Sequence, residues 1–187
     1  MRNILKIFIV FGIALALPAC APSLHPFYTD DDLVFNEALP GLWIDDSGET
    51  CKFTKSVDNY YELLVMDDEP ARFEARLIDL GGVTFLDLYP KPLGKEINLY
   101  PEHFVPAHTL ARVTIAKDSI SIAMMDGGWL KRLSDQNQLD LKHERINDDM
   151  IELTAPTREL QAFALKNIDN KEAFGEKEVL HRIHSGK

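Results

Sequence analysis

The fold of this chain is decided by the stretch ARFEARLIDLGGVTFLDLY, residues 71–89. In its first half apolar and charged residues alternate, so that Phe73 and Leu77 share one face of an extended chain. Strict alternation of this kind predicts a half-buried antiparallel strand. Gly81-Gly82 then provides a tight turn, and residues 84–89 predict the returning strand. The stretch as a whole therefore predicts a β-hairpin.

Segments on both sides of this hairpin also have the composition of strands. They are separated by turn residues and lie at residues 51–54, 59–66, 109–116, 119–125, 150–153 and 179–183. Short strands at this spacing predict an antiparallel meander that curls into a barrel or a sandwich. We expect a mainly β, barrel or barrel-like fold.

In the last third of the chain the spacing of the apolar residues changes from that of strands to that of helices. A short helical turn is expected at residues 127–133, and Thr154-Ala155-Pro156 predicts the start of a longer helix, with the Thr154 hydroxyl as its cap. The apolar residues that follow at helical spacing are Leu160, Phe163, Ala164 and Ile168. We therefore expect one C-terminal helix that packs across the sheet.

The N-terminus has the pattern of an export signal. Arg2 and Lys6 accompany an almost wholly apolar run at residues 7–17, which is too short to span a bilayer. Leu17-Pro18-Ala19-Cys20 follows and resembles the lipobox of bacterial lipoproteins, with Pro18 as the one departure from it. Membership in that class implies cleavage between Ala19 and Cys20, diacylglycerol on the Cys20 sulfur, and acylation of the new amino group.

This resemblance implies a division of the chain into three segments and a cellular location. We expect a signal peptide at 1–19, a lipidated cysteine with its tether at 20–40, and a single β-rich domain at 41–187. Lipid on Cys20 would anchor the protein to a membrane of the cell envelope. Ala21 replaces the aspartate that commonly retains enteric lipoproteins at the inner membrane, which favours the outer membrane, facing the periplasm. Cys51 is then left as a thiol that we expect to be buried and inert.

The charge of the chain limits its partners. The formal net charge is −10, and without Arg2 and Lys6 the 18 remaining basic residues face 30 acidic ones, a net charge of −12. No basic run is present, so nucleic acid is not an expected partner. Anionic head groups would repel such a body, so its membrane attachment is expected through the lipid on Cys20.

A second resemblance lies at the entrance to the first strand. Gly41-Leu42-Trp43 is similar to the Gly-x-Trp signature of lipocalins and related calycin barrels. It implies that Trp43 closes one end of a barrel, and that an arginine near the end of the chain packs over it; Arg182 and Arg145 are the candidates. The alternative is that Trp43 is simply a large core residue at a strand start.

The sequence carries no recognised catalytic or cofactor motif. It contains no nucleophile elbow, phosphate loop, Cys-x-x-Cys or His-Glu-x-x-His pattern. The pair His181-x-x-His184 lies on an expected strand and tail, where the two rings would not face one metal. We therefore expect no enzyme activity, no catalytic residue, no metal and no cofactor.

Two functions remain open from the sequence. Trp43, Phe85, Asp87 and Tyr89 are candidate ligand-binding residues if the barrel is hollow. If instead Leu86 and Leu88 face the core, Asp87 would face water. A hollow barrel would suit a binding module for a small apolar ligand or lipid. A filled barrel with an exposed apolar patch would suit an interaction or assembly module for an envelope protein, with the loop at 90–106 as a candidate surface.

Overall fold

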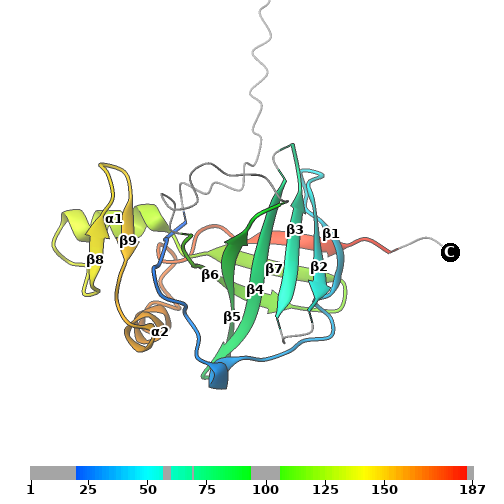
Figure 1. The fold of residues 1–187 in the computed structure, drawn as a ribbon, viewed down its shortest axis with the longest axis horizontal. Helices are drawn as coiled ribbons and strands as arrows, with labels where there is room; N and C mark the ends of the chain where they lie inside the picture. Colours follow the sequence, from blue (N-terminus) through cyan, green and yellow to red (C-terminus); the bar gives the residue numbers. More distant parts are fainter. Residues whose placement is uncertain (1–19, 57–59, 69, 94–105, 185–187) are drawn as a thin grey trace, which may run out of the picture.

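The computed structural model describes residues 20–56, 60–68, 70–93 and 106–184. Within these ranges the chain forms a closed antiparallel barrel whose strands are ordered β1-β10-β7-β6-β5-β4-β3-β2 (Figure 1). The barrel strands are β1 Gly41–Ile44, β2 Thr50–Lys55, β3 Tyr61–Met66, β4 Ala71–Leu80, β5 Val83–Lys91, β6 Thr109–Ile115, β7 Ser119–Met124 and β10 Glu178–Arg182. The predicted barrel is therefore confirmed, and the sandwich alternative is wrong. The predicted signal peptide at 1–19 lies outside the described residues.

The β4–β5 hairpin is the longest part of the barrel wall. Leu80 pairs with Val83 across Gly81 and Gly82, which have φ angles of 64° and 88°. Two consecutive residues with positive φ make the turn whose twist suits a hairpin, and glycine adopts this conformation without steric cost. The register that follows pairs Leu77 with Leu86, and both side chains point into the barrel.

The barrel is closed by a strand from the far end of the chain. Strands β2 to β7 pair in sequence order, and β10 then pairs with both β7 and β1. The segment between β7 and β10 leaves the barrel and forms a side layer, visible on the left of Figure 1. This layer contains α1 Gly127–Asp135, β8 His143–Arg145, β9 Ile151–Leu153 and α2 Thr157–Lys166.

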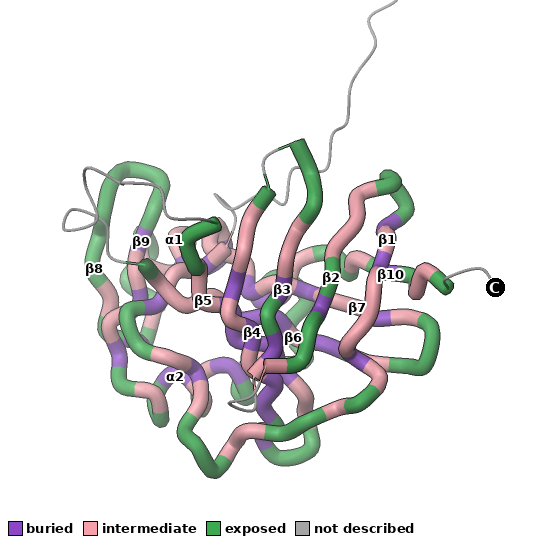
Figure 2. The backbone as a smooth tube through the Cα atoms, turned by 45° about the vertical axis from the view of Figure 1, so that its right-hand side comes forward, coloured by how far each residue is buried: buried purple, intermediate pink, exposed green. Residues whose placement is uncertain are grey.

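Apolar side chains form two separate cores. One fills part of the barrel interior, and the other lies between the outer wall of the barrel and the side layer. In the second core Ile78 and Phe85 of the wall meet Leu130 of α1 and Leu160 of α2, all fully buried. Figure 2 shows buried positions in the middle of the barrel strands and in this layer, while the hairpin ends are exposed. The wall between β4 and β7 is therefore buried on both faces, and the helix α2 packs on the sheet as predicted.

The start of α2 differs from the prediction. Pro156 is its N-cap residue, and the Thr154 hydroxyl is buried with no hydrogen-bond partner among the described residues. The predicted cap at Thr154 is wrong because this residue lies two positions before the N-cap residue of the helix. The backbone N–H of Thr154 instead donates to the carbonyl of Lys142, the residue that precedes β8.

The segment that precedes the barrel is laid along its wall. Ser23 and His108 exchange two backbone hydrogen bonds of 2.8 Å, and the Leu24 N–H donates to the Leu153 carbonyl of β9. Phe27 is fully buried between the wall and α2. The segment ends in a 3₁₀ turn, η2 Asp30–Asp32, before the chain enters β1. The part of the tether that follows Cys20 is thus packed on the body, and it joins the side layer to the barrel.

No helix among the described residues is long and apolar enough to cross a membrane.

Candidate ligand cavity

The barrel encloses a cavity of about 220 Å³ at one of its ends. Its walls are apolar and come from the inward positions of five strands: Phe53, Leu63, Val65, Leu86, Leu88, Ile122, Met124 and Leu180. Because side chains alternate across a strand, these inward positions face the barrel interior together. An eight-stranded barrel has an interior that either fills with side chains or holds one small ligand.

The opposite end of the barrel is filled. Trp43 is fully buried there, and its indole N–H donates to the Leu39 carbonyl at 3.0 Å. The guanidinium carbon of Arg182 lies 4.1 Å from the centre of the Trp43 ring. Arg182 also donates to the carbonyls of Pro40, Ala38 and Lys117, so the cation covers the indole and joins the segment before β1 to the β6–β7 turn. This end of the barrel is a packed plug.

The arginine over Trp43 is Arg182. Arg145, the other candidate, lies in the β8–β9 hairpin and pairs with the exposed Asp135 of α1. Gly41 permits the contact at Trp43, since a Cβ at this position would collide with Nη1 of Arg182. The Gly-x-Trp sequence and the arginine thus form one structural unit.

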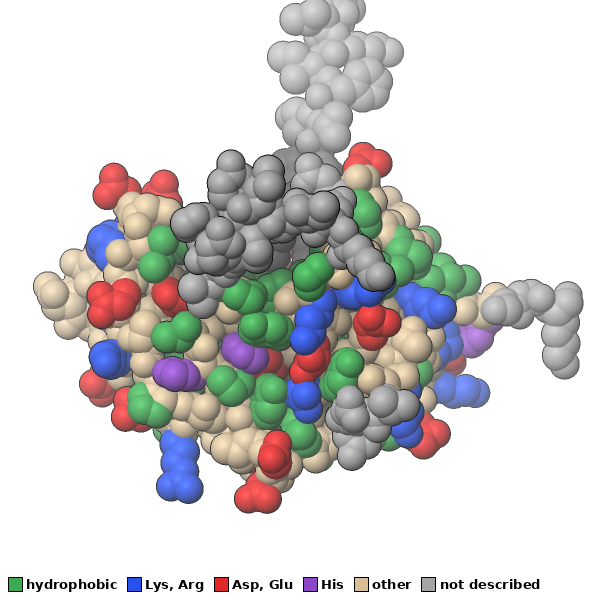
Figure 3. Space-filling view, in the orientation of Figure 1, with side chains coloured by type: hydrophobic (Ala, Val, Ile, Leu, Met, Phe, Trp, Pro, Cys, Tyr) green, Lys and Arg blue, Asp and Glu red, His purple; other side chains and the backbone are tan. Residues whose placement is uncertain are grey.

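The open end of the cavity has a polar rim that is largely acidic. Asp45 and Glu49 belong to the turn between β1 and β2, and Glu178 is the first residue of the neighbouring strand β10. Asp126, Glu176 and the two cysteines, Cys20 and Cys51, also line this end. On the face drawn in Figure 3, by contrast, basic and acidic side chains are intermixed over the described surface.

The rim carboxylates influence one another and the neighbouring thiol. Burial raises the pKa of Glu178, and the negative charges of Asp45 and Glu49 raise it further. Desolvation also raises the pKa of Glu49, with additional contributions from Asp67, Asp45 and Asp68. Burial, with the nearby charges of Glu178 and Asp45, raises the pKa of the Cys51 thiol to about 12. Like charges are thus crowded around the mouth of an apolar space.

The thiolate is the reactive form of cysteine, so a pKa this high leaves Cys51 almost wholly protonated at neutral pH. This supports the predicted inertness of Cys51, although its side chain is partly rather than fully buried. Cys20, the predicted lipidation site, forms a β-bridge with Asp126 beside the same cavity. The N-terminal end of the described chain is therefore at the rim.

Three of the predicted ligand-binding residues lie outside the barrel. Leu86 and Leu88 point inward, so the alternation of β5 places Phe85, Asp87 and Tyr89 on its outer face. Phe85 packs in the core of the side layer. Trp43 does point into the barrel, but at the plugged end. None of these four residues lines the cavity.

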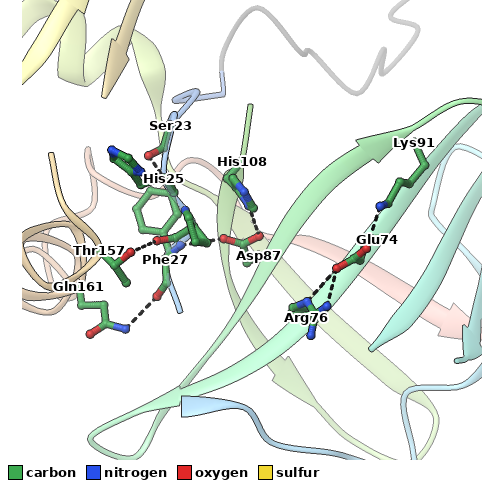
Figure 4. A network of polar contacts seen from close by, with 11 residues as sticks. Ser23, His25, Phe27, Glu74, Arg76, Asp87, Lys91, His108, Thr157 and Gln161 are labelled. Carbon is green, nitrogen blue, oxygen red and sulfur yellow. Dashed lines mark hydrogen bonds and ion pairs between the residues drawn. The ribbon is translucent and has the colours of Figure 1, made fainter. Parts of the chain in front are cut away.

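Asp87 is neither solvated nor in the cavity. It is 1 % exposed, and its Oδ1 lies 2.7 Å from Nδ1 of His108 while its Oδ2 accepts the Phe27 N–H at 2.9 Å. Figure 4 shows the carboxylate between these two partners, with Thr157 and Gln161 of α2 reaching the same segment from the other side. Asp87 therefore fastens the N-terminal segment to the barrel wall. The sequence signal for it was an acidic residue in an otherwise apolar strand.

No metal centre is formed by the described residues: nowhere in them do three His, Cys, Asp or Glu side chains gather as ligands would. His181 and His184 are exposed and lie near different carboxylates, those of Asp46 and Asp118.

Comparisons of the chain with protein-family models, with curated proteins and with solved structures gave no significant match. The class of protein is therefore defined by geometry alone: a closed eight-stranded antiparallel barrel with a plugged end and an apolar cavity at the other.

Proposed function

We propose that this protein is an envelope-anchored lipoprotein whose barrel binds a small apolar ligand or a lipid. The observation that carries the proposal is the apolar cavity at the open end of the barrel. An engineered apolar cavity of about 150 Å³ stays dry and takes up benzene, and the cavity here measures about 220 Å³. It would therefore hold a small apolar molecule or one end of a longer chain.

The packed plug around Trp43 and Arg182 supports the same proposal. It is the arrangement that the resemblance to lipocalins implies, and it seals one end so that a ligand would have a single approach. Fold alone does not specify function, so the argument depends on the cavity and not on the barrel.

The place of Cys20 relates the proposed anchor to the proposed binding site. Cys20 lies at the rim, and the residues after it are held by backbone hydrogen bonds to Leu153 of β9, to His108 just before β6 and to Met125 between β7 and α1. Lipid on this cysteine would hold the cavity mouth close to the membrane surface, because the residues that follow Cys20 are packed on the body. With Ala21 as the residue that follows, we assign this surface to the outer membrane, facing the periplasm. A ligand could then pass between bilayer and cavity over a short path.

The test is native mass spectrometry of the mature chain, residues 20–187, made without its signal peptide so that it stays unlipidated. After incubation with an envelope lipid extract, we expect a discrete adduct on the folded protein. In the variant Val65→Trp, an indole at the cavity wall should exclude the adduct. The matched control is Thr54→Trp, which places the same side chain on the exposed outer face of β2 and should keep it.

A folded wild-type protein without any adduct would overturn this proposal. Cross-linking of the lipidated protein in cells would then test the alternative, an interaction module for an envelope protein. An adduct that Val65→Trp retains would locate binding outside the cavity.

A further inference from the structure

We propose that the ligand of this cavity is a cationic amphiphile, whose apolar chain occupies the barrel while an amine or ammonium head lies among Asp45, Glu49 and Glu178. This inference rests on the proposed function and names the chemical class of its ligand. It follows from the division of the cavity into an apolar wall and an acidic mouth.

The three carboxylates converge from neighbouring strands. Asp45 and Glu49 flank the β1–β2 turn, Glu178 begins β10, which pairs with β1, and all three line the cavity. Asp45 is 7 % exposed, and the backbone N–H groups of Ser47 and Glu49 donate to it at 2.9 and 2.8 Å. Its carboxylate is thus held in place at the mouth, next to the two glutamates.

These carboxylates lack a cationic partner in the described part of the chain. No Lys or Arg described by the structure forms an ion pair with Asp45, Glu49 or Glu178, whereas Glu74 on the outer wall is paired with both Arg76 and Lys91, at 2.7 and 2.9 Å. Uncompensated like charges at a partly desolvated site are unfavourable. A positive charge supplied by a ligand would relieve this repulsion.

An organic cation fits the site better than a metal ion. The rim carboxylates are not gathered closely enough to act as a ligand set with one another or with the nearby thiols. A cation that brings its own apolar body would use both parts of the site at once. The same rim would repel a fatty acid, whose carboxylate would stand beside three others.

The experiment compares three ligands with the same ten-carbon chain: decylamine, decanol and decanoate. Binding to the unlipidated mature chain is measured by isothermal titration calorimetry at pH 7.5 and low ionic strength. We expect decylamine to bind roughly tenfold more tightly than decanol, with decanoate the weakest. Added salt should reduce the preference, because the rim is partly exposed.

The double variant Glu49→Gln/Glu178→Gln isolates the contribution of the rim. Its preference for decylamine over decanol should fall to about twofold or less, while its affinity for decanol is unchanged. The matched control is Glu62→Gln/Glu144→Gln, which removes the same charge from exposed positions outside the cavity and should keep the full preference.

The outcomes separate this inference from the function on which it rests. Equal binding of the three ligands, tightest binding of decanoate, or a preference that survives in the rim double variant would overturn the cationic class and leave the binding cavity in place. Failure of all three ligands to bind a folded protein would overturn both.

Discussion

The two ends of the barrel are built from the same strands but differ in what fills them. At one end Trp43 is fully buried under the guanidinium of Arg182, and the surrounding carbonyls accept the hydrogen bonds of that cation. At the other end the inward side chains leave an apolar space, and the carboxylates around it lack a cationic partner among the described residues. At the first end a cation is paired with carbonyls of the protein, whereas at the second end no Lys or Arg among the described residues is paired with the carboxylates.

This difference predicts which end of the barrel contributes most to stability and which end would gain from the proposed ligand. A packed end contributes free energy of folding, because it buries a large aromatic side chain and pairs the indole N–H and the guanidinium with backbone carbonyls. An end with a cavity and crowded charges contributes less, and it can gain from a ligand what it lacks in the unliganded protein. Variants at the two ends should therefore have opposite effects.

The largest effect is expected at the plugged end. Trp43→Ala should lower the free energy of unfolding by about 3–5 kcal/mol, because it removes a fully buried indole from a site whose neighbours are fixed. Urea unfolding followed by circular dichroism measures this change, and Trp43→Phe should recover most of it. A loss of less than about 1 kcal/mol would show that this end is not a stabilising plug.

Arg182→Met should have a smaller effect of the same sign. The substitution keeps an apolar stem over Trp43 but removes the cation and three donors, so we expect a loss of about 2 kcal/mol in the same urea measurement. Arg145→Met is the matched control: its exposed ion pair should be worth no more than about 0.5 kcal/mol. Equal losses in the two variants would contradict the special role of Arg182.

The smallest effect, and the only stabilising one, is expected at the open end. Burial and its acidic neighbours raise the pKa of Glu178 above its ordinary value of 4.5, so its ionisation opposes folding at neutral pH. Glu178→Gln should stabilise the unliganded protein at pH 7, by less than about 1 kcal/mol because the group is partly exposed.

The pH dependence supplies the check on this last variant. Wild-type Glu178 is protonated in both folded and unfolded states below its ordinary pKa, so the advantage of Glu178→Gln should disappear as the pH falls below about 4.5. The stability advantage of Glu178→Gln should reach its full size once the pH has risen above the raised pKa of Glu178 in the folded wild-type protein. Thermal unfolding at a series of pH values measures this, and a destabilised variant at pH 7 would contradict the crowding of charge at the rim.

Local pattern was sufficient to predict much of the barrel wall. The alternation in residues 71–79 and the Gly81-Gly82 turn predicted the β4–β5 hairpin, because inward and outward positions repeat every two residues whatever lies further away. The strand at β10 and the helix α2 were predicted in the same way. The lipid anchor at Cys20 remains a prediction from the N-terminal motif.

The site itself was only partly predictable. The period of two allowed either orientation for Asp87, and the choice depended on what covers the outer wall of β5. The side layer and the N-terminal segment cover it, so Asp87 is buried between His108 and Phe27 instead of facing water or a ligand. The residues that line the cavity, among them Leu63 and Leu180, were predicted only as apolar strand positions.

The sequence by itself determined the strands, the alternation of their side chains, the acidic charge and the export motif, because each of these depends on the residues themselves or on neighbours within a few positions. Only the tertiary structure decided that β10 closes the barrel, that Arg182 covers Trp43, and that Asp45 and Glu178 meet at one rim. These contacts join residues more than 130 positions apart. Their register is set by the packing of the whole barrel, since no local pattern specifies which distant strand completes a sheet.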